Sequence, residues 1–451
     1  MHRGLKVLAL AMRAQNHVTL PLPKTFYILR LNYENRRGLK VEKRVPHKKT
    51  IIALTILIIL VIVGVGVYWA SITGPGPEKK PIRIGFSISL TGGYASAGTE
   101  VLAAYNVWKN YINEKGGLLG RTVEFVYYDD ESDATKAATI YEKLITVDKV
   151  DLVLGPFSSP IVFQTSTVTE KYQYVMIEPL GWSPTIFQRG YKYLFLSSGV
   201  TCANASHSLY EFILSLPPEQ RPKNYVVTVS SLLVDITFAE GWRKYYAPKL
   251  GLTELLYEEF PPSATDLTSL YMKVKNLNPD IVFVSCITEP TLILAIRTMH
   301  TLGITPKIIY GLDTMGILRV KKDLGDLGKH LMFDSTFQPT LPFPMAREFS
   351  EGFKKATGYL PETHGATSFV ACQILEQAVE GTQSLDNNKI REYILTHSFS
   401  TIQGPMSFNE DGTPKTFTIY HAQWQENPEM YEIVVGPYKT SEPVYPFQWG
   451  G

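Results

Sequence analysis

Cysteine is scarce in this sequence, which limits the ways in which the chain could be cross-linked or could bind a metal. Of the 451 residues only Cys202, Cys286 and Cys372 are cysteines, with no CxxC pair and no spacing typical of a zinc site. At most one disulfide is possible, and the state of all three thiols, including a Cys286–Cys372 pair, stays open. Because free cysteine is among the most buried residue types, we interpret the three as small core residues.

The sequence also lacks a strong charge imbalance and a recognisable catalytic set. Its formal net charge is +2 and 45% of its residues are hydrophobic, which is ordinary for a globular protein and gives no basic footprint for nucleic acid. The nine histidines are scattered without an HxxxH pair, and no GxSxG turn marks a nucleophilic serine. We therefore expect a protein that is not an enzyme, with no catalytic residue, cofactor, metal site or nucleic-acid partner.

Charge is entirely missing from one long apolar run near the N-terminus. Residues 50–72 contain no charged side chain, and about 20 such residues in a helix span a hydrocarbon core of roughly 30 Å. Residues 1–49, before the run, are rich in Lys and Arg. The positive-inside rule then predicts a single-pass cell-membrane anchor over 50–72, with a basic cytoplasmic tail over 1–49. Whether the anchor is cleaved, and whether translation starts later, stays open.

Strand and helix patterns alternate after a Gly- and Pro-rich linker over 73–81. Alternation of this kind predicts an α/β fold with parallel, doubly wound sheets and right-handed crossovers. Predicted strands cover 82–90, 122–128, 152–154, 175–177, 225–228, 254–259, 281–284 and 307–310, and predicted helices cover 100–114, 133–146, 237–250, 266–276 and 290–302. Two sets of strands indicate two lobes, with a ligand site between them.

One stretch of the first set points to a binding crevice. Residues 150–163 form a short apolar strand, a Gly155-Pro156 break, two serines and a helix with Pro160 in its first turn. A strand that leads through Ser158-Ser159 into a helix directs free N–H groups and hydroxyls into the crevice beyond the strand, where a carboxylate can be held. The simpler alternative is that these serines only cap the helix.

An acidic stretch, 129–133 (DDESD), allows a second hypothesis. Asp129 and Asp130 could hold a divalent cation in a membrane-anchored glycosyltransferase. The favoured interpretation is a strand end followed by Ser132 or Asp133 as the N-cap of the next helix.

Four stretches together carry a resemblance to a known family. They are 85–92 (GFSISLTG), 113–120 (NEKGGLLG) leading to Tyr128-Asp129-Asp130, 154–159 (LGPFSS) and 402–412 (IQGPMSFNEDG). From Pro81 onward the chain resembles the type I periplasmic solute-binding proteins of ABC importers, in the leucine/isoleucine/valine-binding protein family. The resemblance implies two lobes joined by a three-strand hinge near Ser198, Asp334 and Gln403. The expected lobes are 82–198 plus 335–402, and 199–334 plus 403–451.

The resemblance also implies where a ligand binds. The ligand carboxylate falls on Ser159 and on the loop of Leu180, Gly181 and Trp182, where Trp182 replaces the usual small hydroxyl residue. The acidic partner of an α-ammonium group falls on Asp313, unless this residue only forms a turn. Glu178 is an alternative polar contact. The predicted site is completed by four further residues: Tyr94 and Phe238, which would cover the ligand, and Phe157 and Ser158.

The function expected from the resemblance is capture of an amino acid or similar polar solute by hinge closure, followed by delivery to an ABC permease. An alternative is a ligand-sensing receptor domain of the same fold, in which the basic tail would have a role. The sequence leaves open the ligand, the permease and the use of the Asn204 glycosylation sequon.

Overall fold

The computed structural model describes residues 48–73, 80–415 and 419–450. The chain forms two compact units, Met1–Pro77 and Glu78–Gly451, which are described separately. Almost all of the predicted basic tail, and most of the predicted linker over 73–81, lie outside the described residues.

The described part of the first unit is one helix, α2 (Lys48–Thr73). Its apolar side chains that the structure describes, from Ile52 to Val65, are each more than half exposed. A search of the described residues finds no helix with the length and apolar character needed to cross a membrane. The membrane anchor over 50–72 therefore stays a prediction.

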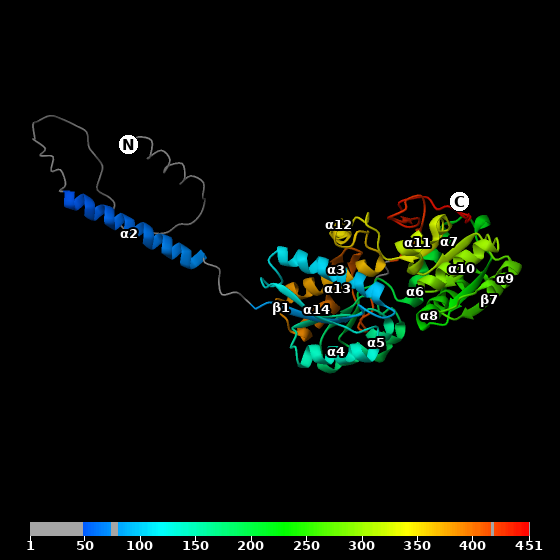
Figure 1. The fold of residues 1–451 in the computed structure, drawn as a ribbon, viewed down its shortest axis with the longest axis horizontal. Coiled ribbons are helices and arrows are strands. Elements are labelled where there is room, and N and C mark those ends of the chain that lie inside the picture. The colour runs from blue at the N-terminus through cyan, green and yellow to red at the C-terminus, as the bar shows by residue number, and fades with distance from the viewer. Residues whose placement is uncertain (1–47, 74–79, 416–418, 451) are drawn as a thin grey trace, which may run out of the picture. The chain divides into compact units, whose positions relative to one another are not determined.

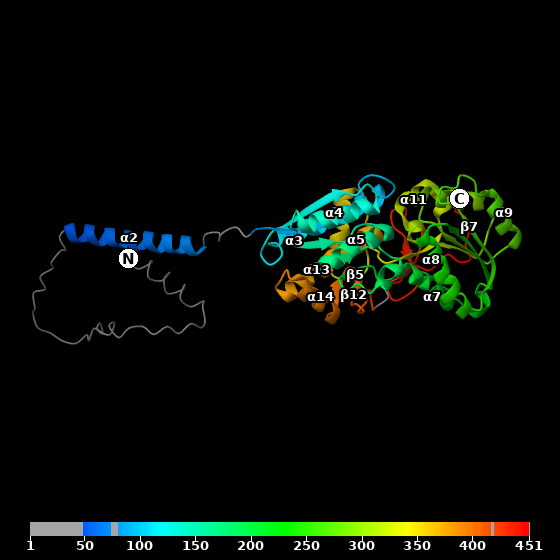
Figure 2. The same ribbon diagram turned by 90° about the horizontal axis from the view of Figure 1, so that it is seen from below.

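The second unit begins with a parallel sheet in the order β2-β1-β3-β4-β5. Its strands are β1 (Ile82–Ile88), β2 (Val123–Asp129), β3 (Leu152–Leu154), β4 (Met176–Glu178) and β5 (Leu194–Leu196). Helices α3 (Ala95–Glu114) and α13 (Thr363–Thr382) pack together on one face, and α4 (Ala134–Thr146) and α5 (Ser159–Tyr172) run side by side on the other (Figures 1 and 2). Both faces are covered, which explains why the short strands β3 (LVL) and β5 (LFL) are wholly apolar.

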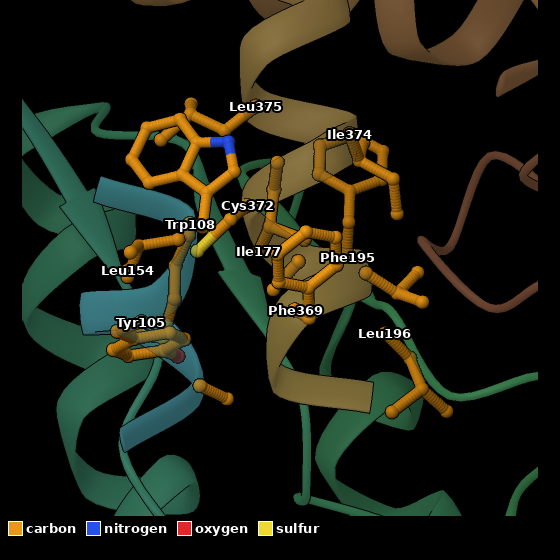
Figure 3. Packing of buried hydrophobic residues seen from close by; sticks show 14 of the residues in the cluster. Tyr105, Trp108, Leu154, Ile177, Phe195, Leu196, Phe369, Cys372, Ile374 and Leu375 are labelled. Atoms are coloured by element: carbon orange, nitrogen blue, oxygen red, sulfur yellow. The ribbon is translucent and has the colours of Figure 1, made fainter. Parts of the chain in front are cut away.

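The core of this first sheet includes side chains of α4 and α5 on one face and of the α3–α13 pair on the other. Figure 3 shows Trp108 of α3 and Cys372 of α13 among side chains from β3, β4 and β5. The Trp108 indole N–H donates to Glu376 Oε2 at 2.7 Å, so the one polar atom of this buried ring is satisfied. Helix α13 comes almost 170 residues after β5, yet it completes the first core.

The second sheet has the order β14-β13-β10-β9-β8-β6-β7. Strands β6 to β10 are parallel, and β13 and β14 add antiparallel pairs at one edge. Their bounds are β6 (Asn224–Ser230), β7 (Thr253–Phe260), β8 (Ile281–Ser285), β9 (Ile308–Gly311), β10 (Met332–Ser335), β13 (Tyr420–Gln423) and β14 (Glu432–Ile433).

Alternate residues of these strands supply two cores. Val226, Val282 and Ile309 face α9 (Thr268–Leu277) and α10 (Glu289–Thr301). Val227 and Phe283 face α7 (His207–Ser215) and α8 (Leu233–Gly241). The period of two places adjacent residues on opposite sides of the sheet.

Shorter elements complete the second unit. They are α6 (Cys202–Ala205), α11 (Leu318–Leu324), α12 (Ala346–Thr357), α14 (Asn387–Thr396), the hairpin β11 (Phe399–Thr401) with β12 (Gly404–Met406), a π-helical turn (Trp242–Tyr246), and 3-10 turns at Pro184–Arg189, Pro218–Gln220, Pro248–Leu250, Asp313–Gly316 and Gly325–Gly328. The helix expected over 237–250 is wrong in extent, because α8 begins at Leu233 and gives way at Trp242 to the π-helical and 3-10 turns.

The chain connects the two sheets three times. The first two connections follow β5 and β10, near the predicted Ser198 and Asp334. The third differs from the prediction at Gln403. Phe408 lies against Phe195 with ring centroids 5.5 Å apart, and Leu196 N donates to the carbonyl oxygen of Gly412. The hairpin and the loop after it therefore belong with the first sheet, and the third connection follows Gly412.

The three cysteines are free and buried. This confirms their interpretation as core residues: Cys202 and Cys372 belong to the first core and Cys286 to the second.

Candidate functional site

A strained turn stands at the carboxyl end of β3. Gly155 must be glycine here, because an added Cβ would lie 2.4 Å from the Cα of Glu178 on the neighbouring strand. Ser158 then adopts φ 79° and ψ 143° before α5 begins at Ser159. A non-glycine residue in this region stores on the order of 1–3 kcal/mol of strain, which is typical of functional sites.

The two serines differ from the roles expected of them. Ser158 occupies the N-cap position but makes no side-chain capping bond, and its buried Oγ has no hydrogen-bond partner among the described residues. Ser159 Oγ instead accepts from the backbone N–H of Ser183 at 3.2 Å. The buried hydroxyl without a partner among the described residues is thus that of Ser158, while Ser159 ties the next loop to α5.

That loop, residues 179–183, is organised around Glu178 at the end of β4. Glu178 Oε2 accepts from the backbone N–H groups of Leu180, at 2.8 Å, and of Gly181. Its other oxygen, Oε1, is buried without a partner in the described structure. Burial raises the pKa of Glu178 to about 8, although the two backbone N–H groups oppose this rise.

Trp182 fills space in this corner. The residue is only 6% exposed, and its indole N–H donates to the carbonyl oxygen of Pro179 at 3.1 Å. The donor that replaces the usual hydroxyl is therefore already used inside the loop.

An aromatic row leads from the first loop toward the second sheet. Tyr94 and Phe157 have ring centroids 5.4 Å apart, and Phe157 and His364 are also 5.4 Å apart, both with edge-to-face geometry. The predicted Tyr94 and Phe157 are thus brought together.

Phe238 is not brought to this row. It is fully buried in the second sheet's core, 4.9 Å from the ring of Phe283 and 6.1 Å from that of Tyr310. The expectation that it covers a ligand is wrong for this structure, because Phe238 lies on the inward face of α8.

Asp313 lies at a cavity beside the second sheet. His364, in the first turn of α13, stands between two acids: its Nε2 is 3.8 Å from Asp313 Oδ2, and its Nδ1 is 3.9 Å from Glu100 Oε2. Burial raises the pKa of Asp313 to about 7 and raises that of Glu100, while it lowers the pKa of His364. The cavity is lined by Asp313, Gly316, Ile317, Phe333, Asp334, Ser335, Glu362, Thr363, His364 and Tyr431.

Two further carboxyl groups line this cavity. Asp334 is fully buried, and neither of its carboxyl oxygens has a hydrogen-bond partner within the described ranges. Glu362 Oε1 accepts from the backbone N–H of Leu318 at 2.6 Å. Burial raises the pKa of both groups, and neighbouring acids add to the rise.

Sequence reasoning missed the roles of Glu100, Glu362 and His364, and recognised Asp334 only as a hinge position. Asp334 carried a signal, because a charged residue directly follows the apolar residues of a predicted hinge strand. Glu100, Glu362 and His364 carried none, since only the packing of α3 against α13 brings them together.

The acidic stretch after β2 has a different role from a metal site. Asp129 accepts from the backbone N–H groups of Leu90, Thr91 and Glu131, and Asp130 accepts from the hydroxyls of Ser87 and Ser89. These carboxylates therefore hold the loop between β1 and α3. Asp133 caps α4 by accepting from Lys136 N, as one interpretation predicted.

The α/β fold with two largely parallel sheets agrees with a known protein family. The model of the periplasmic binding protein family matches residues 81–428, and the chain therefore belongs to that family, as the four sequence stretches indicated. This is a family of solute-binding proteins rather than a class of enzymes.

Individual relatives are distant in sequence. The Leu/Ile/Val-binding protein homolog 2 of Brucella abortus is 25% identical over 360 residues, covering 78% of this chain and 92% of that protein. The substrate-binding protein LivJ of Streptococcus pneumoniae, solved with isoleucine, superposes with a TM-score of 0.68 at 21% identity, covering 81% of this chain and 100% of that one. A solute-binding protein from R. palustris, solved with benzoate, gives 0.66 at 18% identity, covering 81% and 98%.

Proposed function

We propose that this protein is an extracytoplasmic solute-binding protein that captures a small polar solute, an amino acid or a related compound, and delivers it to an ABC permease. The observation that carries the proposal is a row of contacts that joins the first sheet to the cavity beside the second: the rings of Phe157 and His364 are 5.4 Å apart, and His364 Nε2 is 3.8 Å from Asp313 Oδ2. Ser158 and Glu178 stand at the end of the first sheet, and Asp313 follows β9 of the second. His364 lies close to Asp313 from a helix that packs on the first sheet.

Closure of the two lobes is the proposed capture step. A ligand shifts an open and closed equilibrium only as far as it binds the closed state more tightly. Groups split between two lobes, such as Asp313 and Ser158, meet this condition because a ligand contacts both sets only when the lobes are close. Family membership and the isoleucine complex of LivJ support an amino acid or a chemically related solute.

Membrane anchoring is part of the proposal and rests on the charge-free run over 50–72. The test is fractionation of cells that express either the full chain or a chain lacking residues 1–77. We expect the full chain in the membrane pellet after a carbonate wash and the truncated chain in the released fraction. Recovery of the full chain in the released fraction would reject the anchor and leave solute binding untouched.

A thermal-shift screen of the purified full chain tests solute binding. The panel contains amino acids, amines, amides, sugars and nucleotides. A solute present at 100 times its Kd adds about 2.7 kcal/mol to the free energy of unfolding. Stabilisation by one chemical class, lost in Asp313→Asn, is the expected result. If no class stabilises the protein, capture of a small solute is rejected.

Delivery requires a separate measurement. Cells lacking the protein should lose uptake of the radiolabelled solute found in the screen, and the full chain should restore it. Restoration of binding without restoration of uptake would favour the ligand-sensing alternative over transport.

A further inference from the structure

The backbone N–H groups of the loop after β4 are already bonded to Glu178, an acidic residue of the chain itself. Two backbone N–H groups, of Leu180 and Gly181, point at one spot, as they would around a bound carboxylate. That spot is taken by Glu178 Oε2, and Gly181 allows the close approach, since an added Cβ would lie 2.9 Å from this oxygen. A ligand carboxylate would therefore find both donors in use.

The neighbouring donors of the loop are engaged as well. The N–H of Ser183 donates to Ser159 Oγ, and the indole N–H of Trp182 donates to Pro179. Losing a hydrogen bond to a charged group typically lowers affinity about tenfold or more. A carboxylate in this corner would find the Ser158 hydroxyl unpaired but would lack the loop N–H bonds that help to repay its desolvation.

The cavity beside the second sheet, in contrast, is rich in carboxyl groups and poor in cationic donors. It is lined by Asp313, Asp334 and Glu362, and the residues that line it include no Lys or Arg. The Arg319 guanidinium, whose pKa Glu362 helps to raise, is held by Glu289, to which its Nε donates at 2.7 Å. The His364 side chain is 19% exposed, and the burial of most of its ring favours the neutral form.

The environment of Asp334 is an independent indication that this cavity binds a ligand. It is fully buried, it lines the cavity, and neither carboxyl oxygen makes a hydrogen bond of normal geometry within the described residues, although the backbone N–H groups of Asp313 and of Asp334 itself lie near enough to oppose the rise of its pKa. Buried polar groups are almost always hydrogen-bonded. An N–H-rich cationic group from outside the chain would satisfy both oxygens and the excess of acid together.

We propose that the solute is an organic amine without a carboxylate group. Glu178 occupies the place that a ligand carboxylate would take, and Asp313 and Asp334 bind the ammonium group. This inference rests on the proposed solute-binding function and narrows its ligand class. Glu178 thereby acts as a specificity-determining residue, because it blocks the anion-binding donors that an amino acid would require.

Matched pairs of compounds that differ only by the carboxylate test this inference. The pairs are isoamylamine and leucine, tyramine and tyrosine, cadaverine and lysine, and agmatine and arginine. Their binding to the full chain is measured by thermal shift and then by isothermal titration. For the pair that binds, we expect the amine to bind at least about tenfold more tightly than its parent amino acid.

Two substitutions at Glu178 distinguish the effect of freeing the two backbone N–H groups from the effect of removing the carboxyl charge. Glu178→Ala frees both N–H groups and should raise the affinity for the parent amino acid about tenfold relative to the amine. Glu178→Gln is the matched control, because its amide oxygen still accepts both N–H groups, and its preference for the amine should be unchanged. Asp334→Asn should weaken amine binding about tenfold, while Asp323→Asn, the same change on the exposed side of α11, should not.

The outcomes are distinguishable. A parent amino acid that binds as tightly as its amine, or more tightly, overturns this inference but keeps the proposed function. Stabilisation only by sugars, nucleotides or carboxylic acids has the same effect. If neither these pairs nor any compound of the wider screen binds, the proposed function itself fails. Should Glu178→Ala fail to fold, the comparison of Asp334→Asn with Asp323→Asn still decides the position of the ammonium end.

Discussion

Glu178 and Asp313 are two buried acids at corresponding places in the two sheets. Glu178 ends β4 of the first sheet, and Asp313 follows β9 of the second. Burial raises both pKa values, to about 8 and about 7. Their partners differ, however: Glu178 accepts two backbone N–H groups of its own loop, whereas Asp313 faces a histidine and a cavity with further acids.

This difference shows that local backbone geometry decides what a buried acid does. A loop that directs N–H groups at the carboxyl satisfies it from within, and leaves little for a ligand to gain. The Asp313 carboxyl has one backbone N–H beside it, that of Thr314, and lies near the Asp334 carboxyl, so a ligand with donors can still satisfy its remaining lone pairs. At the end of the first sheet the loop N–H groups are therefore already bonded to Glu178. At the second sheet, carboxyl groups remain that a ligand with N–H donors could bind.

The largest effect is expected for Glu178→Gln, which should change how the free energy of unfolding depends on pH. The folded-state pKa of about 8 exceeds the unfolded value of 4.5, so the folded state retains a proton that the unfolded state has lost. The free energy of unfolding therefore falls as pH rises from about 4.5 to about 8. Glu178→Gln removes this loss, and at pH 9 it should be the more stable protein by on the order of 4 kcal/mol.

Thermal denaturation of both proteins between pH 4 and pH 9 measures this difference. The two should be similar near pH 4, where Glu178 is protonated in both states. Glu219→Gln, at an exposed position, serves as control and should follow the wild type throughout. A difference between Glu178→Gln and wild type that does not grow with pH would show that Glu178 stays ionised in the folded protein.

Asp313→Asn should weaken binding of the solute found in the screen by about tenfold to a hundredfold, equivalent to the loss of roughly 1.5–3 kcal/mol for a hydrogen bond to a charged group. Isothermal titration at pH 8, above the pKa of about 7, measures the change with Asp313 ionised. Asp323→Asn is again the control. Unchanged affinity would return Asp313 to the role of a turn residue.

Ser158→Gly should stabilise the protein by about 1 kcal/mol, because relief of strain exceeds the entropic cost of glycine. It should also weaken solute binding, since it removes the free hydroxyl. Gln173→Gly offers a matched change at the other end of α5, where φ is 57°, and should not alter binding. A loss of stability in Ser158→Gly would contradict the assignment of strain.

His364→Phe should have the smallest effect, below about 1 kcal/mol in the free energy of unfolding. The ring that contacts Phe157 is retained, and the lost nitrogens lie 3.8 and 3.9 Å from the two carboxyls, beyond direct hydrogen-bond distance. Chemical denaturation at pH 7 measures it. A loss of several kcal/mol would mean that His364 links the two acids more tightly than these distances indicate.

Much of the second unit was predictable because its strands have apolar patterns of the right length and its turns contain diagnostic glycines. The strands over 152–154, 175–177 and 281–284 match β3, β4 and β8 within one residue. Predictions were poorer where the pattern does not mark an end. Helix α3 begins at Ala95 rather than near residue 100, and the segment over 237–250 is divided into short turns.

By itself the sequence determined the family and the alternating α/β pattern, and it predicted that the cysteines are core residues, because these features depend on local spacing and on motifs read in order. The tertiary structure alone decided which hydroxyl is free, that Phe238 faces a core, and that Glu178 occupies the N–H groups of its own loop. It also brought His364 of α13 next to Glu100 of α3 and Asp313 after β9. The contact between Glu100 and His364, which are more than 250 positions apart, depends on how whole helices pack, and no local pattern records that packing.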